Sequence, residues 1–167
     1  MVVSGIAQKL NNQMNLEFQT SNLYLHLSEW CTQQRLNGTA TFLRNRAQAS
    51  ITQMMRVFDF MKKSGAWPVV KAEGTYSAEC TSLEDLFSQT VEDYQQRSTI
   101  LSRLAEEAKA QSDAPTLRFL TLLAEQQDRD GMLLETILNE VRHAQKVGTS
   151  EQQTDRHLLG LVSNQRG

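Results

Sequence analysis

The chain has 167 residues, of which 40% are hydrophobic and 22% are charged, and its formal net charge is −2. These values are typical of one soluble globular domain with a sizeable core. No cluster of basic residues exceeds the pair Lys62–Lys63, and no stretch approaches the roughly 18 apolar residues of a membrane helix. The sequence therefore excludes nucleic acid and a membrane as expected partners.

The two cysteines, Cys31 and Cys80, are too few for a disulfide framework or a zinc site. The first ten residues lack the basic and apolar regions of a signal peptide. We therefore expect a reducing, cytoplasmic location. Cys31 continues the apolar stripe of the first helix, so it is expected to be an inert buried thiol.

Apolar residues recur at spacings of three and four from about Ser4 to Leu36, which predicts a first long helix. The pair Asn37–Gly38 suits a left-handed helix end. A second helix is predicted from near Thr39 to Gly65. The next stretch, Trp67 to Cys80, lacks clear periodicity and is long for a connection within a bundle.

A third helix is predicted to begin at Thr81–Asp85, where a hydroxyl residue is followed three residues later by an acid. The segment Asp113–Pro115 ends it and starts a fourth helix, which Gly148 closes. A short fifth helix is expected from about Glu151 to Val162.

Helices of matched length with one apolar face each pack best as a four-helix bundle. A link of roughly 14 residues can span such a bundle, since an extended chain reaches ~3.3 Å per residue. The second and third helices can then run parallel, with one long crossover between them. The sequence thus predicts an all-α single domain over residues 1–167, with the bundle at about 4–148 and a tail at about 149–167.

Polar residues interrupt each apolar stripe near its midpoint. Midpoints lie at one height in an antiparallel bundle, so these residues are expected to form a single layer of Glu17, Ser50, Gln53, Tyr94, Gln127 and Asp130. A carboxylate in such a layer needs a counter-charge, a proton or a metal.

The sequence offers more than one solution for this layer. Arg46, Arg97 and Arg129 lie close in sequence and could supply the counter-charge. A hard cation such as iron could instead use oxygen donors from Glu17, Asp130, Gln127 and Gln53. A hydrogen-bonded layer that fixes the helix register is a further alternative, and all three stay open at this point.

Several segments resemble bacterial non-haem ferritins, in order, over about residues 4–148. They are Lys9–Glu17, Ser21–Tyr24, Gly38–Arg44, Ser82–Phe87 and Glu125–Gln127. The resemblance implies a ferritin-like four-helix bundle with a short fifth helix. It also implies a centre that oxidises Fe(II), and a homo-oligomeric cage of 24 subunits that stores ferric mineral.

The resemblance also assigns roles to individual residues. Glu17 stands where the family has its first-helix metal glutamate, Gln127 matches the fourth-helix amide ligand, and Asp130 stands where a glutamate is usual. Tyr24 matches the tyrosine beside the centre, which implies a role as one-electron donor. The resemblance assigns no role to Gln53, which the polar layer offers as a weak amide donor.

Other family ligands are replaced. Ser50 and Gln53 stand in place of the second-helix Glu-x-x-His pair, and Tyr94 stands in place of the third-helix glutamate. This pattern is similar to the divergent bacterial ferritin B paralogues. Haem is not expected, because Ile51 stands where bacterioferritins carry a methionine.

The resemblance therefore implies an iron-binding and iron-storage protein with a degenerate di-iron centre and weak or unusual Fe(II) oxidation. An alternative is a non-catalytic subunit that co-assembles with an active ferritin, or that donates iron to an acceptor such as an iron–sulfur protein. A bundle scaffold without a metal role is the third reading.

Overall fold

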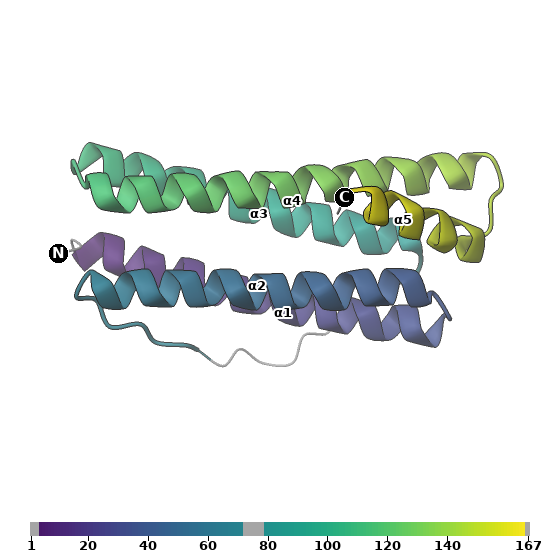
Figure 1. Cartoon of the computed structure of the whole chain (residues 1–167), viewed down its shortest axis with the longest axis horizontal. Coiled ribbons are helices and arrows are strands. Elements are labelled where there is room, and N and C mark those ends of the chain that lie inside the picture. The colour runs from purple at the N-terminus through teal and green to yellow at the C-terminus, as the bar shows by residue number, and fades with distance from the viewer. Residues whose placement is uncertain (1–3, 72–78, 166–167) are drawn as a thin grey trace.

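The computed structural model describes residues 4–71 and 79–165, with side chains at residues 5–71 and 79–160. This part of the chain forms α1 (Ser4–Gln33), α2 (Asn37–Lys63), α3 (Leu83–Ala110), α4 (Ala114–Lys146) and α5 (Glu151–Gln165). The hairpins α1–α2 and α3–α4 lie side by side as an elongated bundle, and α5 folds back along one end (Figure 1). Helices α2 and α3 run in the same direction, which confirms the predicted topology with a long crossover.

Part of the predicted crossover, residues 72–78, lies outside the described residues. Within the described part, none of the helices combines the length and apolarity that a membrane span requires.

The junction between α1 and α2 differs from the prediction. Helix α1 ends at Gln33, and it is Arg35 that takes the left-handed conformation, with φ 61°. Asn37 and Gly38 do not stop a helix but form the first turn of α2. At Gly38 a Cβ would lie 2.6 Å from Cγ of Leu159 on α5. The glycine therefore allows close packing of α5 and does not serve a left-handed turn.

The other predicted helix ends are confirmed. The Ser82 hydroxyl caps α3 by accepting a hydrogen bond from a backbone N–H of its first turn, at 3.0 Å. The Asp113 carboxylate caps α4 in the same way, at 3.2 Å. Gly65 and Gly148, after the ends of α2 and α4, take φ of 82° and 77°. These are left-handed conformations that glycine adopts without steric cost.

Helix α5 caps two other helices. Asp155 accepts hydrogen bonds from the backbone N–H groups of Thr39 at 2.7 Å and Gly38 at 3.2 Å. One turn earlier, Glu151 accepts one from the N–H of Leu83 at 2.7 Å. Since α2 and α3 are parallel, their N-termini lie at the same end of the bundle. The two acids of α5 therefore meet both positive helix ends at once.

The core of the bundle consists of two apolar clusters with a polar layer between them. One cluster is built around Leu27, Leu43, Phe87 and Leu138, and the other around Leu10, Val57, Leu101 and Leu120. Between the clusters, α1 buries a run of polar side chains: Gln13, Glu17, Thr20 and Ser21. Polar groups in such a position need partners from the neighbouring helices, because little water reaches them.

Candidate functional site

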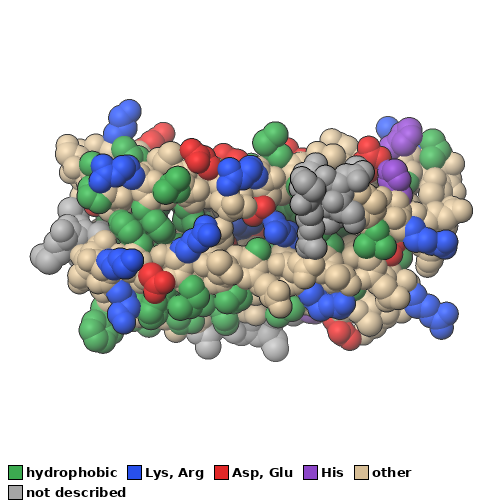
Figure 2. Space-filling view, viewed as in Figure 1, with side chains coloured by type: hydrophobic (Ala, Val, Ile, Leu, Met, Phe, Trp, Pro, Cys, Tyr) green, Lys and Arg blue, Asp and Glu red, His purple; other side chains and the backbone are tan. Residues whose placement is uncertain are grey.

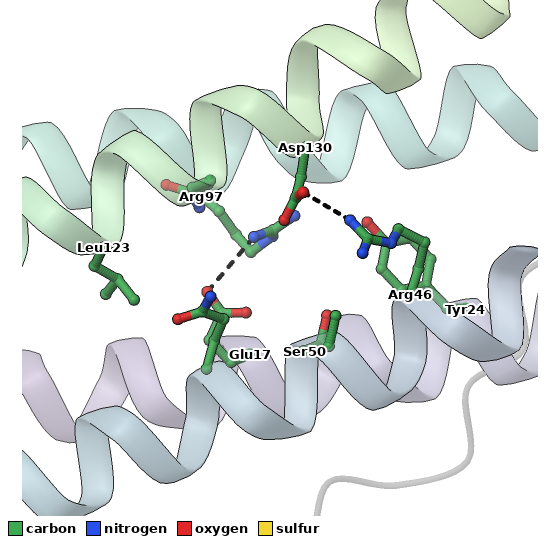
Figure 3. A pocket seen from close by; sticks show the side chains of 10 residues that line it. Glu17, Tyr24, Arg46, Ser50, Arg97, Leu123 and Asp130 are labelled. Carbon is green, nitrogen blue, oxygen red and sulfur yellow. Dashed lines mark hydrogen bonds and ion pairs between the residues drawn. The ribbon is translucent and has the colours of Figure 1, made fainter. Parts of the chain in front are cut away.

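A small pocket lies in the polar layer, enclosed by α1–α4 (Figure 3). Its cavity volume is about 20 Å³, enough for about one water molecule. All five predicted site residues line it: Glu17, Tyr24, Gln53, Gln127 and Asp130. The remaining lining residues are Arg46, Ala49, Ser50, Arg97 and Leu123. The structure thus brings the predicted residues together at one height of the bundle.

Each helix presents these side chains through its own periodicity. Glu17 and Tyr24 stand two turns apart on α1, and Ser50 and Gln53 stand one turn apart on α2. Helix α4 contributes Gln127 and Asp130 at the same spacing. Glu17 and Gln127 are 3% and 6% exposed, so the pocket is shielded from bulk water at its centre.

The prediction that Tyr94 of α3 belongs to the polar layer was wrong. Tyr94 does not line the pocket, and its hydroxyl instead donates a hydrogen bond to Asp128 at 3.1 Å. Its ring covers Gly131, where a Cβ would lie 2.1 Å from the ring. Arg97 enters the pocket in its place. Arg97 stands about one turn after Tyr94, on the same side of α3, so the longer side chain from the next turn reaches the pocket.

Arg97 is held by carboxylates on two helices. Its Nη1 lies 3.5 Å from Oε1 of Glu17, and its Nε donates to Oδ2 of Asp93 at 2.8 Å. The Thr20 hydroxyl donates to the same Asp93 oxygen at 2.9 Å. The sequence does not predict Asp93 and Thr20 as parts of this network. Asp93 and Arg97 are four residues apart on α3, a spacing that is typical of ion pairs on an exposed helix surface. Arg97 itself is one of the counter-charges that the sequence suggests.

A second ion pair closes the pocket between α2 and α4. Nη1 of Arg46 lies 2.7 Å from Oδ1 of Asp130, and both pairs are drawn as dashed lines in Figure 3. In Figure 2 basic and acidic side chains gather near the middle of the visible face, where the two hairpins meet. Both acids of the predicted metal site are therefore paired with guanidinium groups, as the counter-charge alternative predicted for Arg46 and Arg97. Arg129, the third arginine of that alternative, instead donates to Oε1 of Gln126 at 2.8 Å.

The pocket shifts the pKa of its ionisable groups. Burial raises the pKa of Glu17; Arg97 opposes this shift without cancelling it, and Asp93 adds to it. Burial also raises the pKa of Tyr24 to about 12, so its phenol stays protonated. For Arg97, burial lowers the pKa, but Glu17, Tyr24 and Asp93 outweigh it and raise it above the ordinary value. The guanidinium is thus charged, whereas Glu17 keeps a proton more readily than an exposed glutamate.

Some amide groups of the layer have no hydrogen-bond partner. They are Oε1 of Gln53, both amide atoms of Gln127, and Oε1 of Gln13, all buried. Unsatisfied buried oxygens are costly unless water or a ligand meets them. They are also suitable donors for a hard cation. Yet among the described residues no group of three or more His, Cys, Asp or Glu side chains is placed to hold a metal ion.

Residues 7–144 match the Ferritin family, described as a ferritin-like domain. The chain belongs to the ferritin family. It is 54% identical over 165 residues to the bacterial non-heme ferritin-like protein of Escherichia coli strain K12, covering 99% of each chain. It is 34% identical over 161 residues to a bacterial non-heme ferritin of Escherichia coli, covering 96% of this chain and 98% of the relative.

Comparison with solved structures agrees. The ferritin of Chlorobium tepidum superposes with a TM-score of 0.84 at 25% identity, over 99% of this chain and 98% of the other. The resemblance and the ferritin-like fold expected from the sequence are thereby confirmed. Ferritins bind and store iron and form oligomeric cages.

Proposed function

We propose that this ferritin stores iron in a 24-subunit homo-oligomeric cage and oxidises Fe(II) only slowly or unusually at a degenerate intrabundle centre. The observation that carries the proposal is that the two carboxylates expected as metal ligands, Glu17 and Asp130, are each paired with an arginine. With no histidine and no further carboxylate lining the pocket, two metal ions would be poorly held there.

In this proposal Glu17, Asp130, Gln127 and Gln53 are the oxygen donors for Fe(II) as substrate. Two Fe(II) ions lose one electron each to dioxygen, which takes up two protons from water and leaves as hydrogen peroxide. Where only one Fe(II) is bound, the Tyr24 phenol supplies the second electron together with its proton and becomes a phenoxyl radical. The donors Gln53 and Gln127 carry the unsatisfied oxygens that support this role. Cytoplasmic location is part of the proposal, supported by two cysteines that are both free.

A second candidate is a non-catalytic subunit that stores iron and donates it, for example to iron–sulfur proteins, or that co-assembles with an active ferritin. The same pairs favour it, because a carboxylate engaged by a guanidinium offers less charge to a metal.

The test mixes the purified protein with Fe(II) under air and under nitrogen. Ferric absorbance gives the oxidation rate, and native mass spectrometry gives the assembly and its iron content. We expect an assembled cage that gains iron without a rapid phase. Rapid oxidation of two irons per chain would contradict a degenerate centre, and iron uptake without oxidation would favour the second candidate.

A matched pair of variants locates any slow oxidation. The double substitution Glu17→Gln with Asp130→Asn keeps the shapes of the side chains and removes their charge. It is expected to abolish the oxidation, whereas Asp59→Asn on the exposed face of α2 leaves it unchanged. An unchanged rate in the double variant would place the chemistry elsewhere in the cage.

A further inference from the structure

We propose that Arg97 and Arg46 act as built-in competitors of metal in the polar layer, so that a divalent cation binds only by displacing guanidinium groups from Glu17 and Asp130. The proposal rests on the proposed function, and it names the residues that set the metal affinity of the site.

The first part of the argument is how firmly Arg97 is placed. Its side chain is 9% exposed and those of Glu17 and Asp93 are 4% and 22% exposed. The bond to Asp93 at 2.8 Å anchors the guanidinium on its own helix, so that Nη1 faces Glu17 at 3.5 Å. The longer of these two contacts is the one to the expected metal ligand. The arginine therefore has an alternative partner when Glu17 turns to a metal.

The second part concerns Asp130. Its Oδ1 accepts a short hydrogen bond from Arg46 at 2.7 Å and a longer one from the Gln126 amide at 3.3 Å. A metal ion would have to replace both donors at that oxygen. The side chain of Arg46 is 23% exposed, so this guanidinium can move toward solvent at less cost than Arg97.

The third part is the contrast with the neutral donors. Gln127 is 6% exposed, and neither of its amide atoms has a partner. Oε1 of Gln53 is also buried without one. The pocket thus keeps neutral oxygens available while one oxygen of each carboxylate, Oε1 of Glu17 and Oδ1 of Asp130, is engaged by an arginine. The pocket therefore contains oxygen atoms that could bind a cation, but its two carboxylates are bound by arginines.

The fourth part is electrostatic. An arginine in a protein does not lose its proton. The guanidinium groups therefore still compete with a metal ion at high pH. A guanidinium a few ångströms from a divalent cation repels it, and the repulsion is stronger in a buried pocket than in water. Removing one guanidinium charge is therefore expected to raise metal affinity by about tenfold or more.

The experiment titrates the assembled protein with Co²⁺ under nitrogen, using calorimetry and the visible absorbance of the ion. Compared with wild type, Arg46→Gln and Arg97→Gln should each bind Co²⁺ at least about tenfold more tightly. Adding Glu17→Gln to either variant should remove the gain. Arg56→Gln takes the same charge from an exposed position of α2 and should leave Co²⁺ binding as in wild type.

Several results would overturn the inference: unchanged affinity in Arg46→Gln, a gain of equal size in Arg56→Gln, or tight wild-type binding that depends on Glu17. If Arg97→Gln does not fold, the more exposed Arg46 still decides the question. Iron storage by the wild-type cage is measured separately. A cage that stores no iron while the variants gain Co²⁺ binding would reject the proposed function and keep this inference. A cage that stores iron while the variants gain no Co²⁺ binding would keep the proposed function and reject this inference.

Discussion

The Asp155 carboxylate on α5 accepts hydrogen bonds from both the backbone N–H and the hydroxyl of Thr39, at 2.7 and 2.5 Å. Helix α2 has no side-chain cap from its own N-cap residue, Leu36. Its first turn is instead satisfied by an acid more than a hundred residues later in the chain. The C-terminal helix is thus part of the bundle's stabilisation.

Replacing Asp155 should therefore cost stability at α2. Asp155→Ala leaves buried backbone donors without an acceptor, so we expect a loss of about 2 kcal/mol in the free energy of unfolding. Urea denaturation measures the loss, and faster amide hydrogen exchange in the first turn of α2 locates it. Asp59→Ala, at an exposed position of the same helix, should change stability by less than about 0.5 kcal/mol. Equal losses in both variants would rule out capping by α5.

Gly131 is predicted to resist substitution because of Tyr94. An alanine normally favours a helix interior by about 1 kcal/mol over glycine. Here its Cβ would lie 2.1 Å from the tyrosine ring, so Gly131→Ala should destabilise the protein by about 1–3 kcal/mol. In a Tyr94→Ala background the same change should be neutral or stabilising. A double-mutant cycle by thermal denaturation tests this, and an additive cycle would contradict it.

The buried carboxyl of Glu17 should make stability depend on pH. Its pKa in the folded state is raised above the ordinary value of 4.5, chiefly by burial. Below that value the carboxyl is protonated in both states and has no effect. As the pH rises, the unfolded chain loses the proton first, so Glu17 lowers the stability until the folded carboxyl also ionises.

Glu17→Gln should therefore gain stability relative to wild type as the pH increases from about 4.5 toward neutrality. The free energies of unfolding are compared at each pH by urea denaturation. The matched variant Glu106→Gln, at an exposed position of α3, should show no such trend. A relative gain that instead appears on acidification would mean that Arg97 lowers the folded pKa.

The Cys31 thiol should be unreactive in the folded protein. Its side chain is buried, and burial raises its pKa to about 12 from an ordinary 9.0. Thiolate at neutral pH is then reduced by about a thousandfold. The thiol of Cys80 is more accessible, with a pKa raised to about 11. Iodoacetamide labelling of Cys31→Ser and Cys80→Ser variants compares the two. Labelling of Cys31 as fast as in urea would contradict the prediction.

Most of the bundle could be predicted from the periodicity of the apolar residues in the sequence. The apolar stripes, the caps at Ser82 and Asp113 and the glycines after α2 and α4 are local signals, and local signals predicted them. The prediction of a helix end at Gly38 was wrong because this glycine packs against Leu159 on α5, which is distant in the sequence. A glycine that permits close packing and one that permits a turn look alike in a sequence.

The site was predictable as a layer but not as a network. Glu17, Gln127 and Asp130 interrupt apolar stripes, so their inward placement could be inferred. Arg97 could be suggested as a counter-charge, but its burial could not be predicted, because an arginine is rarely buried unless acids surround it. Those acids are Glu17 on α1 and Asp93 on α3, and their meeting depends on the relative rotation of two helices. Neither pattern nor propensity specifies that rotation.

The guanidinium groups of Arg97 and Arg46 are cations that are part of the polypeptide itself. Chelators do not extract them, oxidants do not change their valence, and they are present from the moment of translation. We therefore expect the subunit to fold without iron, because the positive charges beside Glu17 and Asp130 are already part of the chain.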